Sequence, residues 1–253
     1  MGRRIQQVFP RGAGDFLLQL GIWTGFLLAY QVARGLADGG STAEAMENGQ
    51  LLIDVQRELH LLFEPDLQRV VTETGGVLVG ALNWTYWLSQ FAVVGLALLW
   101  IYFFRTDAFA RVRNWLIAAN LIGLVGYVLV PTAPPRMFPE AGFVDTLAQS
   151  AALNHGSAIV ELASNPYAAM PSLHAADSLI IGFAMAMLVR RPWAKVLWTL
   201  WPTWVWFCVM ATGNHFWLDV AAGVGVALLA ATFLAWHEGR RRELAPAPSA
   251  SGR

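Results

Sequence analysis

Residues 167–180 read YAAMPSLHAADSLI and place a histidine at the start of an apolar helix. Pro171 and Ser172 are typical of a helix start, with the serine as N-cap, so His174 falls in the first turn. The apolar run then continues to Val189. A histidine at this position is either a buried polar side chain bonded to a neighbour or a group that takes part in chemistry.

The composition of the chain indicates a membrane protein. Of its 253 residues, 56% are hydrophobic and only 13% are charged, whereas a soluble domain carries about 25% charged residues. The twelve tryptophans agree with this interpretation, because these amphipathic rings favour membrane interfaces. The single cysteine, Cys208, excludes an intrachain disulfide.

Six apolar stretches predict an all-α integral membrane protein, a six-transmembrane-helix bundle, because crossing a bilayer takes about 20 apolar residues. We expect a single catalytic domain over 1–238 and a disordered cytoplasmic tail over 239–253, which is polar and rich in Pro, Ala and Ser. The predicted spans are 16–34, 77–104, 114–131, 172–189, 193–212 and 216–236.

The segment 41–63, between the first two predicted spans, predicts an amphipathic helix. It begins with STAE, a capping-box pattern. Such a helix is either interfacial, lying on the membrane surface, or packed against neighbouring helices, and the sequence leaves both placements open. Its apolar side chains recur at helical spacing opposite charged ones: Leu52, Val55, Leu59 and Leu62 against Asp54, Arg57 and Glu58.

The basic residues predict the orientation, because lysine and arginine collect on the cytoplasmic side of a membrane protein. With six spans, both termini are expected in the cytoplasm, and the loops 36–75, 132–171 and 213–215 face the exterior or periplasm. We expect a multi-pass protein of the plasma or inner membrane. The side predicted to be outer carries only Arg34, Arg57, Arg69 and Arg136; the other carries Arg3, Arg4, Arg11, Arg105, Arg111, Arg113, Arg190, Arg191, Lys195, Arg240, Arg241, Arg242 and Arg253.

Three polar motifs meet at the predicted outer face. PTAPPR (131–136) follows the third span, PSLH (171–174) begins the fourth, and TGNHFWLD (212–219) joins the last two. His215 and Asp219 are four residues apart, so they share one helix face and can hydrogen-bond. An aspartate one turn into a membrane helix requires a partner, and His215 is the predicted one.

These residue types suit phosphoryl transfer without a metal. Asp219 would accept the N–H of one ring nitrogen of His215 and leave the other free to attack phosphorus. Arg136, with backbone N–H groups at the fourth helix start, would hold the phosphate oxygens. A protonated His174 would donate to the leaving oxygen. A metal held by the two histidines lacks a third ligand, so we expect no metal and no cofactor.

The motifs resemble those of the type 2 phosphatidic acid phosphatase superfamily over about residues 77–236. PSLH is similar to the PSGH motif of that superfamily, and HFWLD is similar to the HxxxD ending of its last motif. The resemblance implies that His215 is the nucleophile, that Asp219 orients it and that His174 is the acid.

The cations of the phosphatase branch are missing, because Leu129 replaces its lysine and Cys208 and Val209 replace its Ser-Arg pair. Met137 and Leu173 replace a proline and a glycine. The site therefore resembles more closely the inositol phosphorylceramide synthase and sphingomyelin synthase branch, phosphotransferases that move a phosphorylated headgroup between lipids. A phosphodiester carries one negative charge and a monoester nearly two, so fewer cations suit the diester.

The sequence thus predicts a lipid phosphotransferase or phosphatase with a phosphohistidine-type intermediate, a membrane lipid as substrate and no nucleic-acid partner. A lipid phosphomonoesterase is one alternative, and a transporter or flippase without catalysis is another. The oligomeric state, the donor and the acceptor stay open. Each of these residues also has a purely structural interpretation. His215 and Asp219 could form a buried polar pair without catalysis. Arg136 could anchor the chain at the membrane interface, and Ser172 could be a helix cap rather than a phosphate ligand. The candidate pocket residues are Asn165, Tyr167, Asp177 and Asn214.

Overall fold

The computed structural model describes residues 9–37, 42–148 and 167–243. These residues are helical or irregular, without a strand, apart from one isolated parallel bridge between Thr132 and Ala168. The predicted all-α class is therefore confirmed. The candidate pocket residue Asn165 lies outside the described residues, as does the predicted tail beyond 243.

Each of the six predicted apolar stretches holds a helix. Within the described part of the chain, three helical spans are long and apolar enough to cross a bilayer, namely Gly76–Phe104, Thr106–Leu129 and Trp217–Arg241, and α9 is apolar but shorter. The helices are α2 (Ala13–Ala37), α5 (Gly76–Leu88) continued by a π-helical turn η1 (Ser89–Val93) and α6 (Val94–Phe104), α7 (Thr106–Leu129), α9 (Leu173–Leu188), α10 (Pro192–Ala211) and α11 (Trp217–Glu243).

Two predicted boundaries were wrong. Helix α7 begins at Thr106 rather than at 114, so Arg111 and Arg113 belong to the helix. Helix α11 continues to Glu243, so the first residues assigned to the tail are helical. In both places charged side chains interrupt the apolar pattern, but long arginine side chains can extend toward water from a helix that is still intact.

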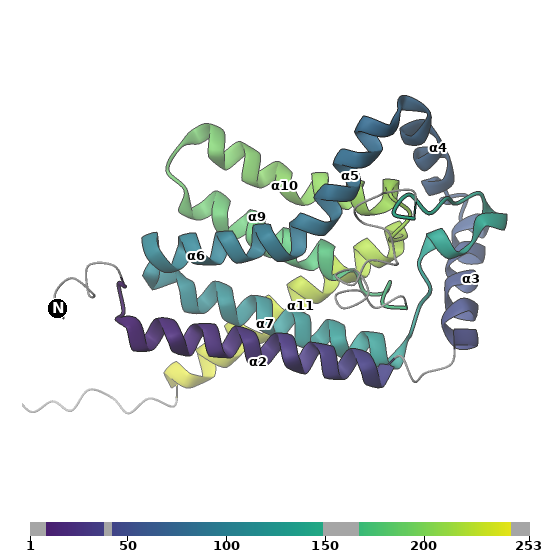
Figure 1. Cartoon of the computed structure of the whole chain (residues 1–253). Helices are drawn as coiled ribbons and strands as arrows, with labels where there is room; N and C mark the ends of the chain where they lie inside the picture. Colours follow the sequence, from purple (N-terminus) through teal and green to yellow (C-terminus); the bar gives the residue numbers. More distant parts are fainter. Residues whose placement is uncertain (1–8, 38–41, 149–166, 244–253) are drawn as a thin grey trace, which may run out of the picture.

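Helix α9 lies at the centre of the bundle and packs against α7, α10 and α11 (Figure 1). Its side chains Leu173, Ile180 and Ile181 are fully buried. Gly182 lets α10 come close, since a Cβ there would lie 2.7 Å from Cγ of Pro202. Small residues at such crossings are typical of helices packed in membranes. Large apolar side chains cover the outside of the bundle, among them Leu17, Leu96, Leu129, Phe183, Met187 and Leu229.

The two ends of the bundle differ in character. The start of α2, the α6–α7 and α9–α10 connections and the end of α11 lie at one end, and α3, α4 and the segment 130–148 lie at the other (Figure 1). The starts of α9 and α11, which carry the histidine motifs, are at the same end as α3 and α4. The three polar motifs thus meet at one end, opposite the end that carries Arg105, Arg190, Arg191 and Lys195.

The predicted amphipathic segment forms α3 (Thr42–Glu58), and α4 (Glu64–Thr74) follows it. The buried face of α3 packs against the segment after α7: Asn48 donates to the carbonyl of Pro131 at 2.8 Å, and Ala45 accepts from the backbone N–H of Ala133 at 2.9 Å. A Cβ at Gly49 would lie 2.6 Å from the ring of Phe138, so only glycine fits. The buried line is Ala45, Gly49, Ile53 and Gln56.

The apolar stripe predicted for this helix is therefore not its most buried line. Leu59 lies beyond the end of α3 and is 55% exposed, while Leu52 and Val55 are only half-buried. The packing that the sequence left open as an alternative is present, because α3 covers the loop beside the motifs. Two members of the buried line, Ala45 and Gly49, are small, and a search for large apolar residues at helical spacing misses them.

Candidate active site

The two histidines of the motifs lie side by side. His174 is in the first turn of α9, His215 is in the turn before α11, and their ring centroids are 5.6 Å apart. The starts of the two helices are joined by the backbone N–H of Ser172, which donates to the carbonyl of Asp219 at 2.9 Å. A Cβ at Gly223 would lie 2.1 Å from the Ser172 carbonyl oxygen, so glycine is required there. The close contact of the two helices is what brings the histidines together.

The backbone rather than Asp219 makes the hydrogen bond to the His215 ring. Nδ1 of His215 lies 2.9 Å from the carbonyl oxygen of Ala169 and 3.5 Å from Oδ2 of Asp219. Because a carbonyl only accepts, this bond places the proton on Nδ1 and leaves the Nε2 lone pair free. We predicted Asp219 for this contact, and its carboxylate instead lies beside the ring without making this hydrogen bond.

Ala169 is held in place by the isolated bridge of the fold. Thr132 donates its N–H to the carbonyl of Tyr167 at 2.9 Å, and its own carbonyl accepts from Ala169 at 3.2 Å. These two bonds fix residues 167–169, which precede α9, so the Ala169 carbonyl faces His215. The side chain of Asp219 is anchored separately, since its Oδ2 accepts from the N–H of Phe216 at 2.8 Å.

His215 is held in its neutral form. His215 is only 4% exposed. Burial lowers the pKa of its ring from 6.5 to about 3, because desolvation disfavours the charged form. The Ala169 carbonyl opposes this change in pKa, and the positive charge of Arg136 adds to it. At neutral pH the ring is therefore a neutral imidazole with a free Nε2 lone pair, the form that can act as a nucleophile.

His174 and Ser172 are placed by the start of α9. The half-buried ring of His174 stacks on Tyr86 of α5, with centroids 4.3 Å apart and planes inclined by 21°. Ser172 is the N-cap, and its hydroxyl oxygen accepts from the N–H of Ala175 at 3.3 Å. The cap interpretation of Ser172 is confirmed, and its contact with phosphate stays a prediction.

Arg136 reaches the site from the loop after α7. Its Nη1 donates to Oδ1 of Asn214 at 2.7 Å, and its backbone N–H donates to the carbonyl of Gly213 at 2.8 Å. Asn214 is itself fixed, because its amide donates to the hydroxyl of Thr212 at 2.8 Å. Burial lowers the pKa of the Arg136 guanidinium, and the carboxylate of Asp145 opposes this. Arginine keeps its charge in proteins, so a cation stands beside the His215 turn.

Two other candidate residues lie outside this constellation. Asp177 is buried one turn deeper in α9, where its Oδ1 accepts from the amide of Asn120 at 2.7 Å. The Tyr167 hydroxyl lies 3.3 Å from the hydroxyl of Thr42, on the α3 side. Of the four candidate pocket residues, Asn214 therefore contacts the arginine, and Asp177 and Tyr167 point elsewhere.

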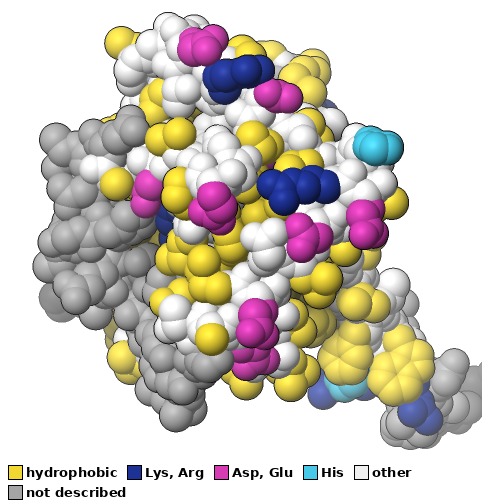
Figure 2. Space-filling view, turned by 90° about the vertical axis from the view of Figure 1, so that its right-hand side faces the viewer, with side chains coloured by type: hydrophobic (Ala, Val, Ile, Leu, Met, Phe, Trp, Pro, Cys, Tyr) yellow, Lys and Arg dark blue, Asp and Glu magenta, His cyan; other side chains and the backbone are white. Residues whose placement is uncertain are grey.

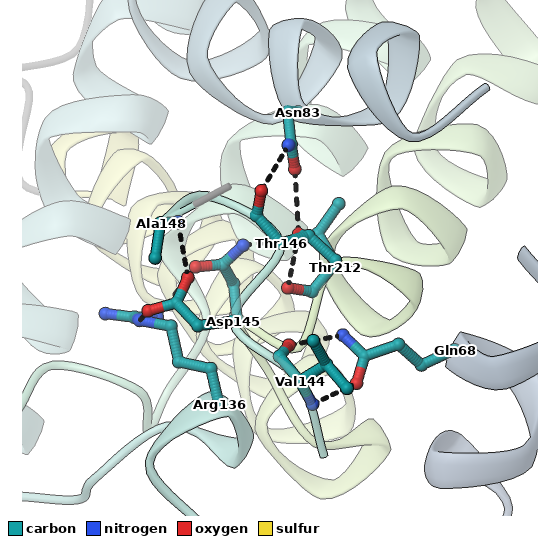
Figure 3. Close-up of polar contacts among 9 residues, drawn as sticks. Gln68, Asn83, Arg136, Val144, Asp145, Thr146, Ala148 and Thr212 are labelled. Atoms are coloured by element: carbon teal, nitrogen blue, oxygen red, sulfur yellow. Dashed lines mark hydrogen bonds and ion pairs between the residues drawn. The ribbon is translucent and has the colours of Figure 1, made fainter. Parts of the chain in front are cut away.

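Several residues that build the site were not predicted. Glu64 at the start of α4 accepts from the backbone N–H of Trp217 at 2.9 Å and so caps α11 beside His215; burial raises the pKa of this carboxyl. Asp145 lies with its Oδ2 4.0 Å from Nε of Arg136 (Figure 3). Neither carboxylate lies in one of the three motifs, and each comes near the site only through tertiary contacts.

Among the described residues, no group of three or more His, Cys, Asp or Glu could hold a metal ion.

Comparison with known proteins gives one relative and one family. Phosphoinositol dihydroceramide synthase of Bacteroides thetaiotaomicron is similar, with 29% identity over 123 residues, which are 44% of this chain and 40% of that protein. The chain thus matches less than half the length of that relative. No solved structure matches the chain. The profile of the PAP2 superfamily matches residues 50–233, which include α9, the Arg136 loop and the His215 turn. The chain belongs to the PAP2 superfamily.

Proposed function

We propose that this membrane protein is a lipid phosphotransferase that moves a phosphorylated headgroup from a lipid donor to an alcohol, with His215 as nucleophile. The observation that carries the proposal is the 5.6 Å approach of the His174 and His215 rings. One ring is a neutral imidazole whose Nδ1 is bonded to Ala169, and Arg136 stands beside the same turn. The similarity to a phosphoinositol dihydroceramide synthase supports a diester donor.

The reaction has two displacements at phosphorus. Nε2 of His215 attacks, a P–N bond forms, and the bond from phosphorus to the lipid oxygen breaks while His174 donates a proton to that oxygen. An acceptor alcohol then attacks the phosphorus, its proton passes to His174, and the P–N bond breaks to restore His215. Arg136 holds the non-bridging oxygens as charge develops on them.

The charge of the site favours a phosphodiester over a monoester. Arg136 is a cation beside the His215 turn, since it donates to the side chain of Asn214 and to the carbonyl of Gly213. The other described basic side chains of α3 and α4 are exposed and lie next to acids of their own helices, Arg57 with Asp54 and Arg69 with Asp66. A phosphomonoester carries about −1.5 to −2 at pH 7, and burying that excess charge without further cations is unfavourable.

We propose that all six helices cross the membrane, with both termini in the cytoplasm and the site at the exterior or periplasmic side. The structure is compatible with the alternation this requires, since successive helices run from one end of the bundle to the other (Figure 1). The basic connections at the opposite end then face the cytoplasm, as the distribution of positive charge predicts. The substrate accordingly enters from the outer leaflet.

A cysteine-labelling experiment tests this topology. The native Cys208 is buried, so single cysteines can be introduced over a low background. Glu140→Cys, on an exposed turn at the site end, should react with an impermeant maleimide in intact cells. Asp107→Cys, exposed at the start of α7, should react only after the cells are permeabilised. The reverse pattern would place the site in the cytoplasm and contradict an outer-leaflet substrate.

Asp219→Asn should lower kcat by about 10²-fold. The carboxylate 3.5 Å from Nδ1 stabilises positive charge on the His215 ring during transfer, and asparagine removes that charge while its Oδ1 can still accept from Phe216. The tautomer stays correct because the Ala169 carbonyl holds it. A mis-set tautomer costs about 10⁴-fold in a serine protease. A loss of that size in initial-rate measurements would therefore show that Asp219, not Ala169, sets the tautomer.

The proposed function is tested with purified protein and two matched lipids, a phosphodiester and a phosphomonoester with the same diacyl chains. We expect kcat/KM to be higher for the diester in the presence of an alcohol acceptor such as inositol or a lipid alcohol, with product carrying the transferred headgroup. Activity should persist in EDTA. A preference for the monoester with water as acceptor would identify a phosphatase, and turnover of neither lipid would favour a transporter.

A further inference from the structure

Asp145 is a carboxylate at the cation of the proposed phosphate site. Its Oδ2 lies 4.0 Å from Nε of Arg136, while Nη1 of the same guanidinium donates to Asn214. The Arg136 side chain is 8% exposed and that of Asp145 is 28% exposed, so solvent screens this pair only in part. The backbone N–H of Arg136 donates to the carbonyl of Gly213 at 2.8 Å, two residues before His215. Asp145 therefore lies next to the arginine that is bonded to the His215 turn.

The segment that carries Asp145 is fastened from both sides (Figure 3). Gln68 of α4 makes two hydrogen bonds to the backbone of Val144, both 2.8 Å long. Asn83 of α5 donates to the carbonyl of Thr146 at 2.9 Å and accepts from its hydroxyl at 2.9 Å. The Thr146 hydroxyl also lies 3.1 Å from the carbonyl of Thr212, beside Asn214. The buried side-chain amides of Gln68 and Asn83 thus hold the residues on either side of Asp145, and they fix its position in the segment.

The surface at this end offers little compensating positive charge. Figure 2 shows acidic side chains spread among hydrophobic ones over this face, with basic side chains sparse. The described arginines of α3 and α4 lie next to the acids of their own helices. Among the described residues, a phosphate bound at Arg136 is therefore close to the charge of that arginine and to the carboxylate of Asp145, with the helix N-termini adding about half a charge each.

We propose that Asp145 determines specificity by charge: it reduces the positive potential at Arg136 so that a singly charged phosphodiester is accepted and a doubly charged phosphomonoester is rejected. This inference rests on the proposed function, since it explains the preference for a diester donor. Repulsion between the Asp145 carboxylate and a phosphate bound at the neighbouring Arg136 changes the affinity for that phosphate roughly tenfold for each unit of its charge. A dianion therefore experiences it twice as strongly, in free energy, as a monoanion.

The test is Asp145→Asn, with Asp145→Glu and Glu140→Gln as controls. Asparagine keeps an oxygen that can accept from the N–H of Ala148, as Oδ1 of Asp145 does at 2.9 Å, so the turn is retained and only the charge is lost. Glu140→Gln removes a negative charge from an exposed position of the same loop. We expect Asp145→Asn to raise the ratio of kcat/KM for monoester over diester about tenfold, and both controls to leave that ratio within about twofold of wild type.

A pH series separates charge from structure. The second ionisation of a phosphomonoester has a pKa of about 6, so wild-type kcat/KM for the monoester should fall relative to the diester between about pH 5.5 and 7.5. Asp145→Asn should flatten this fall. The other ionisable groups at the site, namely Arg136, Tyr86, His174, His215, Asp219 and Glu64, are the same in both variants, so their effects cancel in the comparison.

The outcomes distinguish this inference from the proposed function. If wild type prefers the monoester, the proposed function is wrong, and Asp145 is still judged by whether Asp145→Asn shifts the ratio. If wild type prefers the diester and Asp145→Asn lowers both activities equally, Asp145 is merely structural and the inference fails alone. If neither lipid turns over, affinity is measured instead of kinetics. The increase in the thermal unfolding temperature is recorded with inorganic phosphate, a dianion, and with dimethyl phosphate, a monoanion, at pH 8. Asp145→Asn should then gain about tenfold more affinity for the dianion than for the monoanion, and equal gains would overturn the inference.

Discussion

His215→Ala should lower headgroup transfer by at least about 10⁴-fold while the protein still inserts and folds. Without Nε2 no P–N bond forms, and a missing nucleophile removes one of two linked displacements rather than a single contact. The ring also bonds the Ala169 carbonyl, but the turn keeps its backbone bonds, because the N–H of residue 215 donates to the carbonyl of Val209 at 3.1 Å. Steady-state rates with a diester donor measure the loss.

His60→Ala is the matched control for this variant. His60 is exposed in the turn after α3, at the same end of the molecule and away from the motifs, so its removal should leave activity within about twofold of wild type. Monodispersity in detergent and an unchanged thermal transition show that His215→Ala is folded. An active, folded His215→Ala protein would remove His215 from the mechanism.

His174→Ala should lower kcat by about 10²- to 10⁴-fold with a lipid donor, the range typical of a general acid. The loss should depend on the leaving group. A lipid alkoxide needs a proton as it departs, whereas p-nitrophenolate is stable without one. With a p-nitrophenyl phosphodiester the variant should therefore be within about tenfold of wild type, because His215 and Arg136 are intact.

The comparison of the two donors separates acid catalysis from packing. His174 stacks on Tyr86, so its removal also loosens the contact between α5 and α9. A packing defect should lower kcat equally with both donors. Loss of the acid should lower kcat only with the lipid donor, which has the poor leaving group. Equal losses with both donors would assign His174 a structural role. Tyr86→Phe, which keeps the aromatic ring, should retain most of the activity with either donor.

The helices and the motif residues could be predicted because their signals are local. The apolar stretches are continuous over the length of a span. His215 and Asp219 are only four residues apart, so they lie close together even though His215 precedes α11 rather than sharing its face. The pairing of PSLH with HFWLD followed from alternation of the spans. The ring separation of 5.6 Å between His174 and His215 agrees with that inference.

The remaining features depend on tertiary contacts that leave no pattern in the sequence. The acceptor for His215 is a backbone carbonyl, that of Ala169, and any residue at that position supplies the same oxygen. Asp145 is nine residues from Arg136 in an irregular segment, and its placement depends on Gln68 and Asn83 from two other helices. The buried face of α3 was misjudged because Gly49, not a leucine, makes its tightest contact.

The central claim, that His215 forms the bond to phosphorus, is tested most directly by trapping the intermediate. Purified enzyme is mixed with a diester donor whose headgroup phosphate is radiolabelled, with no acceptor alcohol, and is quenched in alkali and digested. We predict label on the peptide that contains His215, stable in alkali, released by acid and absent from His215→Ala. In a parallel reaction, a donor chiral at phosphorus should give product with retained configuration, as two displacements require. Label on another residue, or inversion at phosphorus, would contradict the account.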